Sequence, residues 1–314
     1  MPHTTRRVLL GSATLAAMAG RAAAQGVETE VKYSAGTAPA RLAVPPGATD
    51  CHHHVYDARF PADPRTTLRP ADASPADYEA LRRRLGTSRS VLVQPSTYGT
   101  DNRLHLQAMR ELGPQRTRMV AVVDTSVSDA DLRTMQEAGV RGIRFNIVNP
   151  GVTTWEMVEP LSRRVAPLGW HVQFNVLARQ IEEHAALLGR LPTPIVFDHL
   201  AHVDLPDWER APGYTALRRL LNGGKTWIKL SGAYNDSKVG AAGNYSDTVP
   251  LARSYVAAAP ERLVWASDWP HVTESTKPDT AKLLDLLGEW VPDERQRNRI
   301  LVDNPAQLYG FPPA

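Results

Sequence analysis

Two kinds of hydrophobic pattern alternate along this chain. From residue 48 onward, short runs rich in β-branched residues alternate with longer segments in which apolar residues recur every three or four positions. The first pattern is typical of buried strands and the second of amphipathic helices. Strands are predicted at residues 49–55, 90–94, 119–124, 142–147, 171–176, 195–199, 226–231 and 263–268. Helices are predicted at residues 75–86, 103–112, 129–138, 155–168, 178–188, 214–221, 249–258, 279–290 and 294–301.

This regular alternation predicts the fold class. Strands joined by crossover helices form a parallel sheet of the α/β class. Eight such units favour a TIM-type (β/α)8 barrel, here a single catalytic domain over residues 46–312. A doubly wound dinucleotide-binding sheet would need a glycine fingerprint after a strand, and the sequence contains none.

The first 24 residues have the pattern of an export signal. Arg6 and Arg7 precede an apolar run that leads to three alanines at residues 22–24, which is typical of a signal-peptidase site. The paired arginines resemble a twin-arginine signal, so we expect the twin-arginine export machinery as a partner and the bacterial periplasm as the location. The apolar run is shorter than the roughly 20 residues of a membrane span, so no membrane anchor is expected. Residues 25–45 lack periodicity and are predicted to form a linker or arm.

The charge and cysteine content argue against nucleic-acid binding and exclude an intrachain disulfide. Three arginines in the first 24 residues, which contain no acidic residue, account for the whole net charge of +3. The remainder of the chain therefore carries no net charge. No basic face for nucleic acid is expected. Cys51 is the single cysteine, so no intrachain disulfide can form. Strand alternation predicts that Cys51 is buried and faces away from His52 and His54.

Polar side chains gather where the predicted strands end, which is where barrel enzymes carry their catalytic residues. His52 and His54 alternate onto one face of the first strand, His199 ends the sixth, and Asp268 ends the eighth. We predict these four as catalytic. The residues predicted to contact the substrate are Ser96, Tyr98, Arg144, Asn146, Asn175, Lys229 and His271.

Each of these residues also has an ordinary structural explanation. A single histidine at a strand end is often a satisfied structural residue, and Asp268 alone can cap a helix. Their coincidence at one barrel mouth is what indicates a catalytic site. His105 and His184 fall within predicted helices, and we expect them on the surface.

Seven segments together resemble the amidohydrolase superfamily. They are DCHHHV at 50–55, VQPSTYGTDN at 93–102, GVRGIRFN at 139–146, DH at 198–199, KLSGAY at 229–234, SDWPH at 267–271 and DNPAQLYGF at 303–311. Within the superfamily, the chain is similar to the lactone-acting branch of 2-pyrone-4,6-dicarboxylate hydrolases and galactarolactone isomerases. The resemblance extends from about residue 45 to residue 312.

The resemblance assigns roles to individual positions. It implies that Asp268 is the general base, and that Ser96 and Arg144 contact a carbonyl or carboxylate of the substrate. Asn175 stands where metal-dependent relatives place a strand-five ligand, and an amide is a weak ligand for zinc. A site without a cofactor is therefore expected. The alternative is one divalent metal such as zinc, held by His52, His54, His199 and Asp268.

The function expected from these residues is chemistry at the carbonyl of a small-molecule lactone of a sugar acid or dicarboxylate. Attack by water would give hydrolysis, whereas attack by another hydroxyl of the same substrate would give lactone isomerisation. Asn235 stands where dicarboxylate-binding relatives often have arginine, which argues against a doubly charged substrate. Two alternatives remain: a zinc-dependent hydrolase or decarboxylase of the same superfamily, and a non-catalytic binding barrel. The sequence does not indicate the oligomeric state.

Overall fold

The computed structural model describes residues 23–148 and 151–312. The expected export signal at residues 1–24 therefore lies outside the described residues, apart from its last two. The sheet has eight strands in the sequential order β1 to β8, and every neighbouring pair is parallel. The strands are β1 (Thr49–His53), β2 (Arg89–Val93), β3 (Thr117–Ala121), β4 (Val140–Asn146), β5 (His171–Asn175), β6 (Ile195–Phe197), β7 (Thr226–Leu230) and β8 (Leu263–Trp265).

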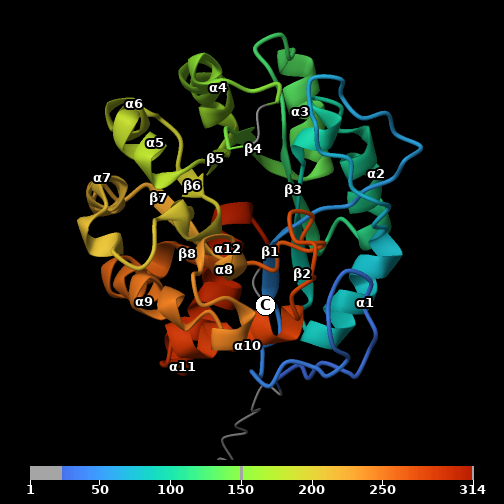
Figure 1. The fold of residues 1–314 in the computed structure, drawn as a ribbon. Coiled ribbons are helices and arrows are strands. Elements are labelled where there is room, and N and C mark those ends of the chain that lie inside the picture. The colour runs from blue at the N-terminus through green and yellow to red at the C-terminus, as the bar shows by residue number, and fades with distance from the viewer. Residues whose placement is uncertain (1–22, 149–150, 313–314) are drawn as a thin grey trace, which may run out of the picture.

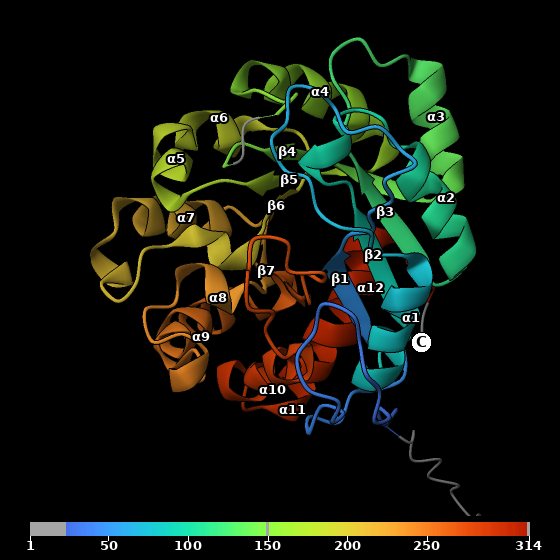
Figure 2. The same cartoon turned by 45° about the vertical axis from the view of Figure 1, so that its right-hand side comes forward.

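The sheet closes on itself just beyond the ends of β1 and β8. The Asp268 backbone N–H donates to the His52 carbonyl at 2.8 Å, and the His54 N–H donates to the Trp269 carbonyl at 2.9 Å. Figure 1 shows the strands in the middle with the helices arranged around them, and Figure 2 shows the same arrangement after a 45° turn. The predicted TIM-type barrel is confirmed.

The helices largely follow the prediction. They are α1 (Pro75–Leu85), α2 (Arg103–Leu112), α3 (Asp129–Ala138), α4 (Val158–Val165), α5 (Ala178–Glu183), α6 (Ala185–Arg190), α7 (Pro212–Asn222), α8 (Ala233–Asp236), α9 (Val249–Ala258), α10 (Thr280–Trp290), α11 (Glu294–Asn298) and α12 (Asn304–Tyr309). Local capping explains several boundaries. The Ser74 hydroxyl accepts from the Asp77 N–H and begins α1, and Gly86, at φ +75°, ends it.

Some predicted helices are shorter or divided. The helix expected at 155–168 contains α4 between two 3₁₀ turns, and the second turn includes Pro167, which cannot donate a helical hydrogen bond. The helix expected at 178–188 is divided into α5 and α6 at His184, whose backbone leaves the helical region. The short helices α8 and α12 were not predicted. Apolar periodicity is too weak a signal over four to six residues to reveal them.

The strands carry two apolar surfaces. Outward-facing residues such as Ile143, Phe174 and Phe197 pack in one cluster with the surrounding helices. Inward-facing residues such as Val91 and Val264 form a second, smaller cluster. Tyr309 and Phe311, from α12 and the segment after it, belong to this inner cluster. Polar residues such as Arg144, Asn146 and Asn175 line a cavity at the carboxyl ends of the strands, so the barrel interior is polar at that end.

Cys51 belongs to the inner apolar cluster, with Val91 and Val264 among its members. The pairing register between β1 and β2 shifts between Asp50 and His53. Such an irregularity interrupts the alternation of side chains between the two faces. The prediction that Cys51 is buried is confirmed, but the prediction that it turns away from the interior-facing His52 is wrong.

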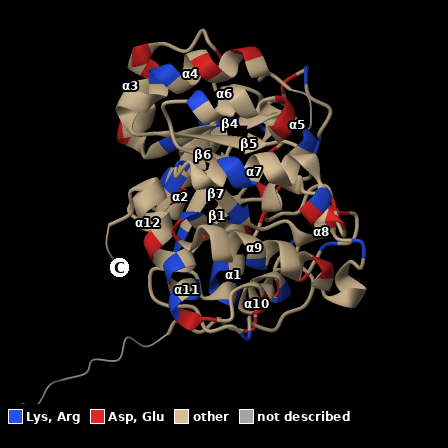
Figure 3. Ribbon diagram, turned by 90° about the vertical axis from the view of Figure 1, so that its left-hand side faces the viewer, with Lys and Arg blue, Asp and Glu red and all other residues tan. Residues whose placement is uncertain are grey.

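Residues 23–48 run along the outside of the barrel as an arm. The buried Arg84 guanidinium of α1 donates to the carbonyls of Ala35 and Ala38 and pairs with Asp279, at the start of α10, at 2.5 Å. These bonds connect the arm to both helices. On the face drawn in Figure 3, acidic and basic residues are interspersed. None of the described helices is long and apolar enough to cross a membrane.

Two histidines outside the barrel mouth differ in burial. His105 on α2 is fully buried beside the Tyr98 ring, so its expected surface position is wrong. The residue lies on the apolar face of α2 that packs against the barrel, which the sequence pattern did not resolve. His184 is half-buried and stacks on Trp155 at 3.8 Å between ring centroids.

Stability should fall in acid because of the inward-facing His171. Burial, and next the nearby Lys229, lowers the pKa of His171 to about 3. Between pH 6.5 and pH 3 the unfolded chain binds a proton that the folded chain does not, so stability is lost as the pH falls through this window. The loss from this group is on the order of 3 kcal/mol between pH 6.5 and pH 4. Urea unfolding at both pH values should show a smaller decrease for His171→Gln than for the wild type, and an equal decrease would contradict this assignment.

Candidate active site

A cavity of about 170 Å³ lies at the carboxyl ends of the strands. Its lining includes seven of the predicted site residues: His54, Ser96, Arg144, Asn146, Asn175, His199 and Asp268. His52 and Lys229 are fully buried and are not among the lining residues. The predicted mouth of the barrel is therefore a real cavity with these side chains around it.

Three imidazoles converge on the Asp268 carboxylate. Asp268 Oδ1 lies 3.6 Å from Nε2 of His52, 3.6 Å from Nε2 of His54 and 3.7 Å from Nε2 of His199. The Nε2 atoms of His52 and His54 are 3.1 Å apart. Four groups predicted from three different strand ends are thus brought together at one point.

The far nitrogen of each imidazole is also held. His54 Nδ1 lies 2.6 Å from the Val93 carbonyl oxygen, so it carries the proton and leaves Nε2 as an acceptor. His199 Nδ1 lies 3.1 Å from the Ser231 hydroxyl. His52 Nδ1 lies 3.2 Å from Asp198 Oδ1 and 3.2 Å from Lys229 Nζ. These contacts fix the ring orientations with Nε2 facing Asp268.

The other oxygen of Asp268 is bound by a tyrosine. The Tyr234 hydroxyl donates to Asp268 Oδ2 at 2.5 Å. Behind it, His271 Nδ1 lies 3.0 Å from the Tyr234 hydroxyl, and His271 Nε2 lies 2.9 Å from the Thr280 hydroxyl. His271 is fully buried and supports Tyr234, but it does not line the cavity. Burial acts to raise the pKa of Asp268, but His199, His54 and His52 hold it well below its usual range, so the carboxylate is ionised.

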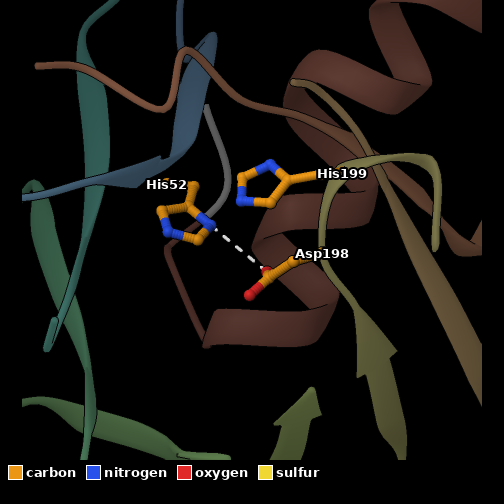
Figure 4. Close-up of side chains that lie close together, drawn as sticks. All are labelled: His52, Asp198 and His199. Carbon is orange, nitrogen blue, oxygen red and sulfur yellow. Dashed lines mark ion pairs between the residues drawn. The ribbon is translucent and has the colours of Figure 1, made fainter. Parts of the chain in front are cut away.

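Below the cavity lies a buried charge cluster centred on Asp198. Its carboxylate lies 3.2 Å from His52 Nδ1, 3.3 Å from Lys229 Nζ and 3.1 Å from Arg144 Nε. Figure 4 shows the His52 contact and the neighbouring His199. Burial acts to raise the pKa of Asp198, but Lys229, His52 and Arg144 hold it well below its usual range. Asp198 was not predicted as a site residue, although its position directly before His199 in the Asp-His pair was a usable signal.

The backbone after Asp198 forms an unusual turn. Residues 199 to 202 all have positive φ, at +49°, +52°, +60° and +45°. L-residues seldom adopt this region, and only the surrounding structure can maintain it. The turn brings His199 and His202 to the same cavity. His202, which the sequence reasoning did not select, lies 3.0 Å from Asp236 through Nδ1 and 2.9 Å from Asn175 Oδ1 through Nε2.

The amide side chains form one wall of the cavity. Asn175 Nδ2 donates to Asn146 Oδ1 at 3.1 Å, and Asn146 Nδ2 lies 3.5 Å from the Ser96 hydroxyl. Tyr98 does not line the cavity, because its hydroxyl accepts from the Asp57 backbone N–H at 2.8 Å. Lys229 donates to Gln173 at 2.9 Å and serves the charge cluster. The substrate-binding roles of Tyr98 and Lys229 stay predictions.

The convergent groups suit one divalent cation. The described residues include two sets of possible ligands whose donor atoms lie within 4.8 Å of one another: His52, His54 and Asp268, and His52, Asp198 and His199. In a tetrahedral zinc site with bonds of about 2.0 Å, the ligand atoms are roughly 3.3 Å apart, close to the 3.1 to 3.7 Å found here. Histidines that bind metals also donate their second N–H to an oxygen, as His54 does to Val93.

The same contacts also permit an arrangement of protons without a metal. If Lys229 donates to His52 Nδ1, the His52 proton lies on Nε2 and forms a hydrogen bond to the bare Nε2 of His54. If Asp198 accepts from His52 Nδ1 instead, both Nε2 atoms are bare and would need a cation between them. The contacts of His52 therefore accommodate either state.

Comparisons with known proteins agree with this geometry. The amidohydrolase family model matches residues 49–311. The chain is 35% identical to a 2-pyrone-4,6-dicarboxylate hydrolase of Comamonas testosteroni, over 85% of this chain and 91% of the relative. It is 31% identical to a D-galactarolactone isomerase of Agrobacterium fabrum, over 90% and 97% respectively. An apo crystal structure from Agrobacterium tumefaciens superposes with a TM-score of 0.83 at 30% identity, covering 90% of this chain and all of that one. The chain therefore belongs to the amidohydrolase family.

Proposed function

We propose that this protein acts on a small hydroxylated lactone, transferring its acyl group either to water or to another hydroxyl of the same molecule. The observation that carries the proposal is the Asp268 carboxylate, which faces the cavity together with Arg144 and His199 and lies within 3.7 Å of three imidazole nitrogens. Relatives that are a pyrone-dicarboxylate hydrolase and a lactone isomerase support this reaction class. Their enzymatic activities also favour catalysis over a purely binding function.

Asp268 is suited to act as the general base. Tyr234 holds Oδ2, so Oδ1 is the oxygen that faces the three imidazoles. An oxygen nucleophile bound near Oδ1 can give its proton to the carboxylate as it attacks the lactone carbonyl. The proton then remains next to the site where the leaving oxygen needs it. The outcome depends on whether that nucleophile is water or a hydroxyl of the substrate.

Arg144 is suited to bind or polarise the substrate. Its Nε is held by Asp198 at 3.1 Å, and among the described residues no other hydrogen bond from its guanidinium is found. The remaining N–H groups can therefore bind a carboxylate or the developing oxyanion. His199, with a pKa lowered by burial, is neutral and can donate only the proton that it carries. Asp198 and Ser231 thus prepare both groups before the substrate enters.

The charges around the cavity indicate the substrate class. Arg144 is the one arginine or lysine among the residues that line the cavity, and Asp198 already shares its charge. The remaining polar lining consists mainly of amides and hydroxyls, such as Asn146, Asn175 and Ser96. Such groups bind hydroxyls well but leave a second carboxylate without a cation. We infer a lactone with one negative charge at most.

We expect Asp268→Asn to abolish lactone turnover. The amide cannot accept the proton, and loss of a general base typically lowers the rate by about 10²- to 10⁴-fold. Purified wild type and variant should be offered aldono- and aldarolactones, with products followed by NMR and folding followed by circular dichroism. The exposed Asp129→Asn serves as a matched control and should leave turnover unchanged. Retained activity in a folded Asp268→Asn protein would remove its role as base.

We further propose that turnover requires no metal. Two observations support this: Asn175 on β5 is bound to Asn146 and His202, and Lys229 can supply the proton arrangement that needs no cation. A bound divalent ion would be held by His52, His54, His199 and Asp268, and would supply Lewis-acid polarisation of the carbonyl.

Metal analysis separates this proposal from the zinc-dependent hydrolase or decarboxylase. Purified protein should keep its lactone turnover after exhaustive treatment with a chelator. One zinc per chain, with activity lost on chelation and restored by zinc, would establish the alternative instead.

Export to the periplasm is also proposed, on the sequence pattern of Arg6, Arg7 and the three alanines at 22–24. In a bacterial host, cell fractionation should place the wild-type chain in the periplasm. Replacement of both arginines by lysine should retain the chain in the cytoplasm. Equal distribution of the two proteins would refute the export proposal.

A further inference from the structure

The Tyr56 hydroxyl is buried without a partner. Tyr56 is 2% exposed, and its hydroxyl has no hydrogen-bond partner among the residues that the structure describes. Buried phenols normally find a partner, and an unsatisfied one costs about 1–3 kcal/mol. The fold therefore maintains a polar atom that destabilises it, and this invites a functional explanation.

Tyr56 is held rigidly beside the catalytic groups. Its backbone N–H donates to the Ala73 carbonyl at 2.9 Å, and its carbonyl accepts from the Ala73 N–H at 2.9 Å. Its ring lies 6.1 Å from the His54 ring, and it lines the cavity together with Arg144 and Asp268. The phenol is therefore fixed in position before any substrate enters.

Tyr56 lies between two cavities. It borders a second cavity of about 380 Å³ whose charged lining residues are Asp57, Arg59, Asp72 and Glu111. It also lines the active-site cavity together with His54, Arg144 and Asp268. Its unpartnered phenol, an O–H donor, therefore lies beside the groups that would surround a bound substrate.

Other buried tyrosines show that this arrangement is not general. The hydroxyls of Tyr78, Tyr234 and Tyr255 bind Asp50, Asp268 and the Leu200 carbonyl. Tyr309 also lacks a partner, but it belongs to the inner apolar cluster around Cys51 and is not a lining residue of the active-site cavity. Tyr56 alone among these five combines an unpartnered hydroxyl with a place in the lining of that cavity.

We propose that Tyr56 is a catalytic residue whose hydroxyl donates a hydrogen bond to an oxygen of the reacting ester group of the bound substrate. The inference rests on the proposed lactone function and adds a donor to it. A substrate oxygen bound in the cavity that Tyr56 lines would complete the hydrogen bonding of its phenol. The bond strengthens as negative charge develops on that oxygen, so it contributes more to the transition state than to substrate binding.

The test is Tyr56→Phe, which removes a single oxygen atom. We expect kcat/KM for the lactone to fall about 10- to 100-fold, mainly through kcat, while the melting temperature stays equal or rises because an unsatisfied hydroxyl has been removed. The matched control is Tyr309→Phe, which removes the other unpartnered hydroxyl and should leave kcat/KM unchanged. Unchanged kcat/KM in Tyr56→Phe, or a fall in both activity and melting temperature, would overturn the proposal.

Calorimetric binding of D-gluconate, an open-chain sugar acid with a single carboxylate, separates this proposal from the proposed function. Weaker binding by Tyr56→Phe than by wild type supports the contact. If, in addition, neither protein turns over any lactone, the lactone function is refuted but the Tyr56 contact is not. If no lactone is turned over, equal affinity of the two proteins, or no binding by the wild type, overturns the Tyr56 contact as well.

Discussion

The closure of the barrel between β1 and β8 is the constraint on which the site depends. Asp50, fully buried, accepts from the backbone N–H groups of Ser267 at 2.9 Å and His52 at 3.2 Å, and from the hydroxyls of Ser267 at 2.6 Å and Tyr78 at 3.0 Å. One carboxylate thereby joins the segment that carries His52 to the segment that carries Asp268. Burial raises the pKa of Asp50 to about 6, although its hydrogen bonds oppose this. The closing point of the barrel and the candidate active site thus lie on the same two segments.

The buried charges beneath this junction act as a unit. Lys229 and Asp198 are both fully buried, and burying two charges is worthwhile only when each keeps a partner and further hydrogen bonds. The Asp198 carboxylate contacts side chains from three strands at once, since Arg144 lies on β4, Lys229 on β7 and His52 on β1. The imidazoles and the guanidinium are therefore oriented by the barrel itself, with little freedom left to lose when a substrate binds. A loosely held site would have to acquire this order at the expense of binding energy.

Most of the fold and of the candidate active site could be predicted from the sequence, because both follow from local patterns. Strand and helix periods predicted the barrel, and the ends of its strands located His52, His54, His199 and Asp268. The residues that could not be predicted from the sequence owe their roles to contacts between distant segments. Asp198 and Tyr234 gain their roles from partners 31 or more positions away. Cys51 faces inward because of a register shift that simple alternation cannot reveal. Tyr56 was not selected because its unpartnered hydroxyl is visible only in the folded structure.

The left-handed turn at residues 199–202 makes a distant helix mechanically part of the active site. A left-handed conformation costs roughly 1–2 kcal/mol for each L-residue, so the turn would relax if its surroundings allowed it. One restraint is the Tyr255 hydroxyl of α9, on the outside of the barrel, which donates to the Leu200 carbonyl at 3.0 Å. Loss of this hydrogen bond would allow His199 to move away from Asp268, although neither of these two residues had been changed. The outer helices therefore do more than cover the barrel, because α9 helps to maintain the strained turn that positions His199.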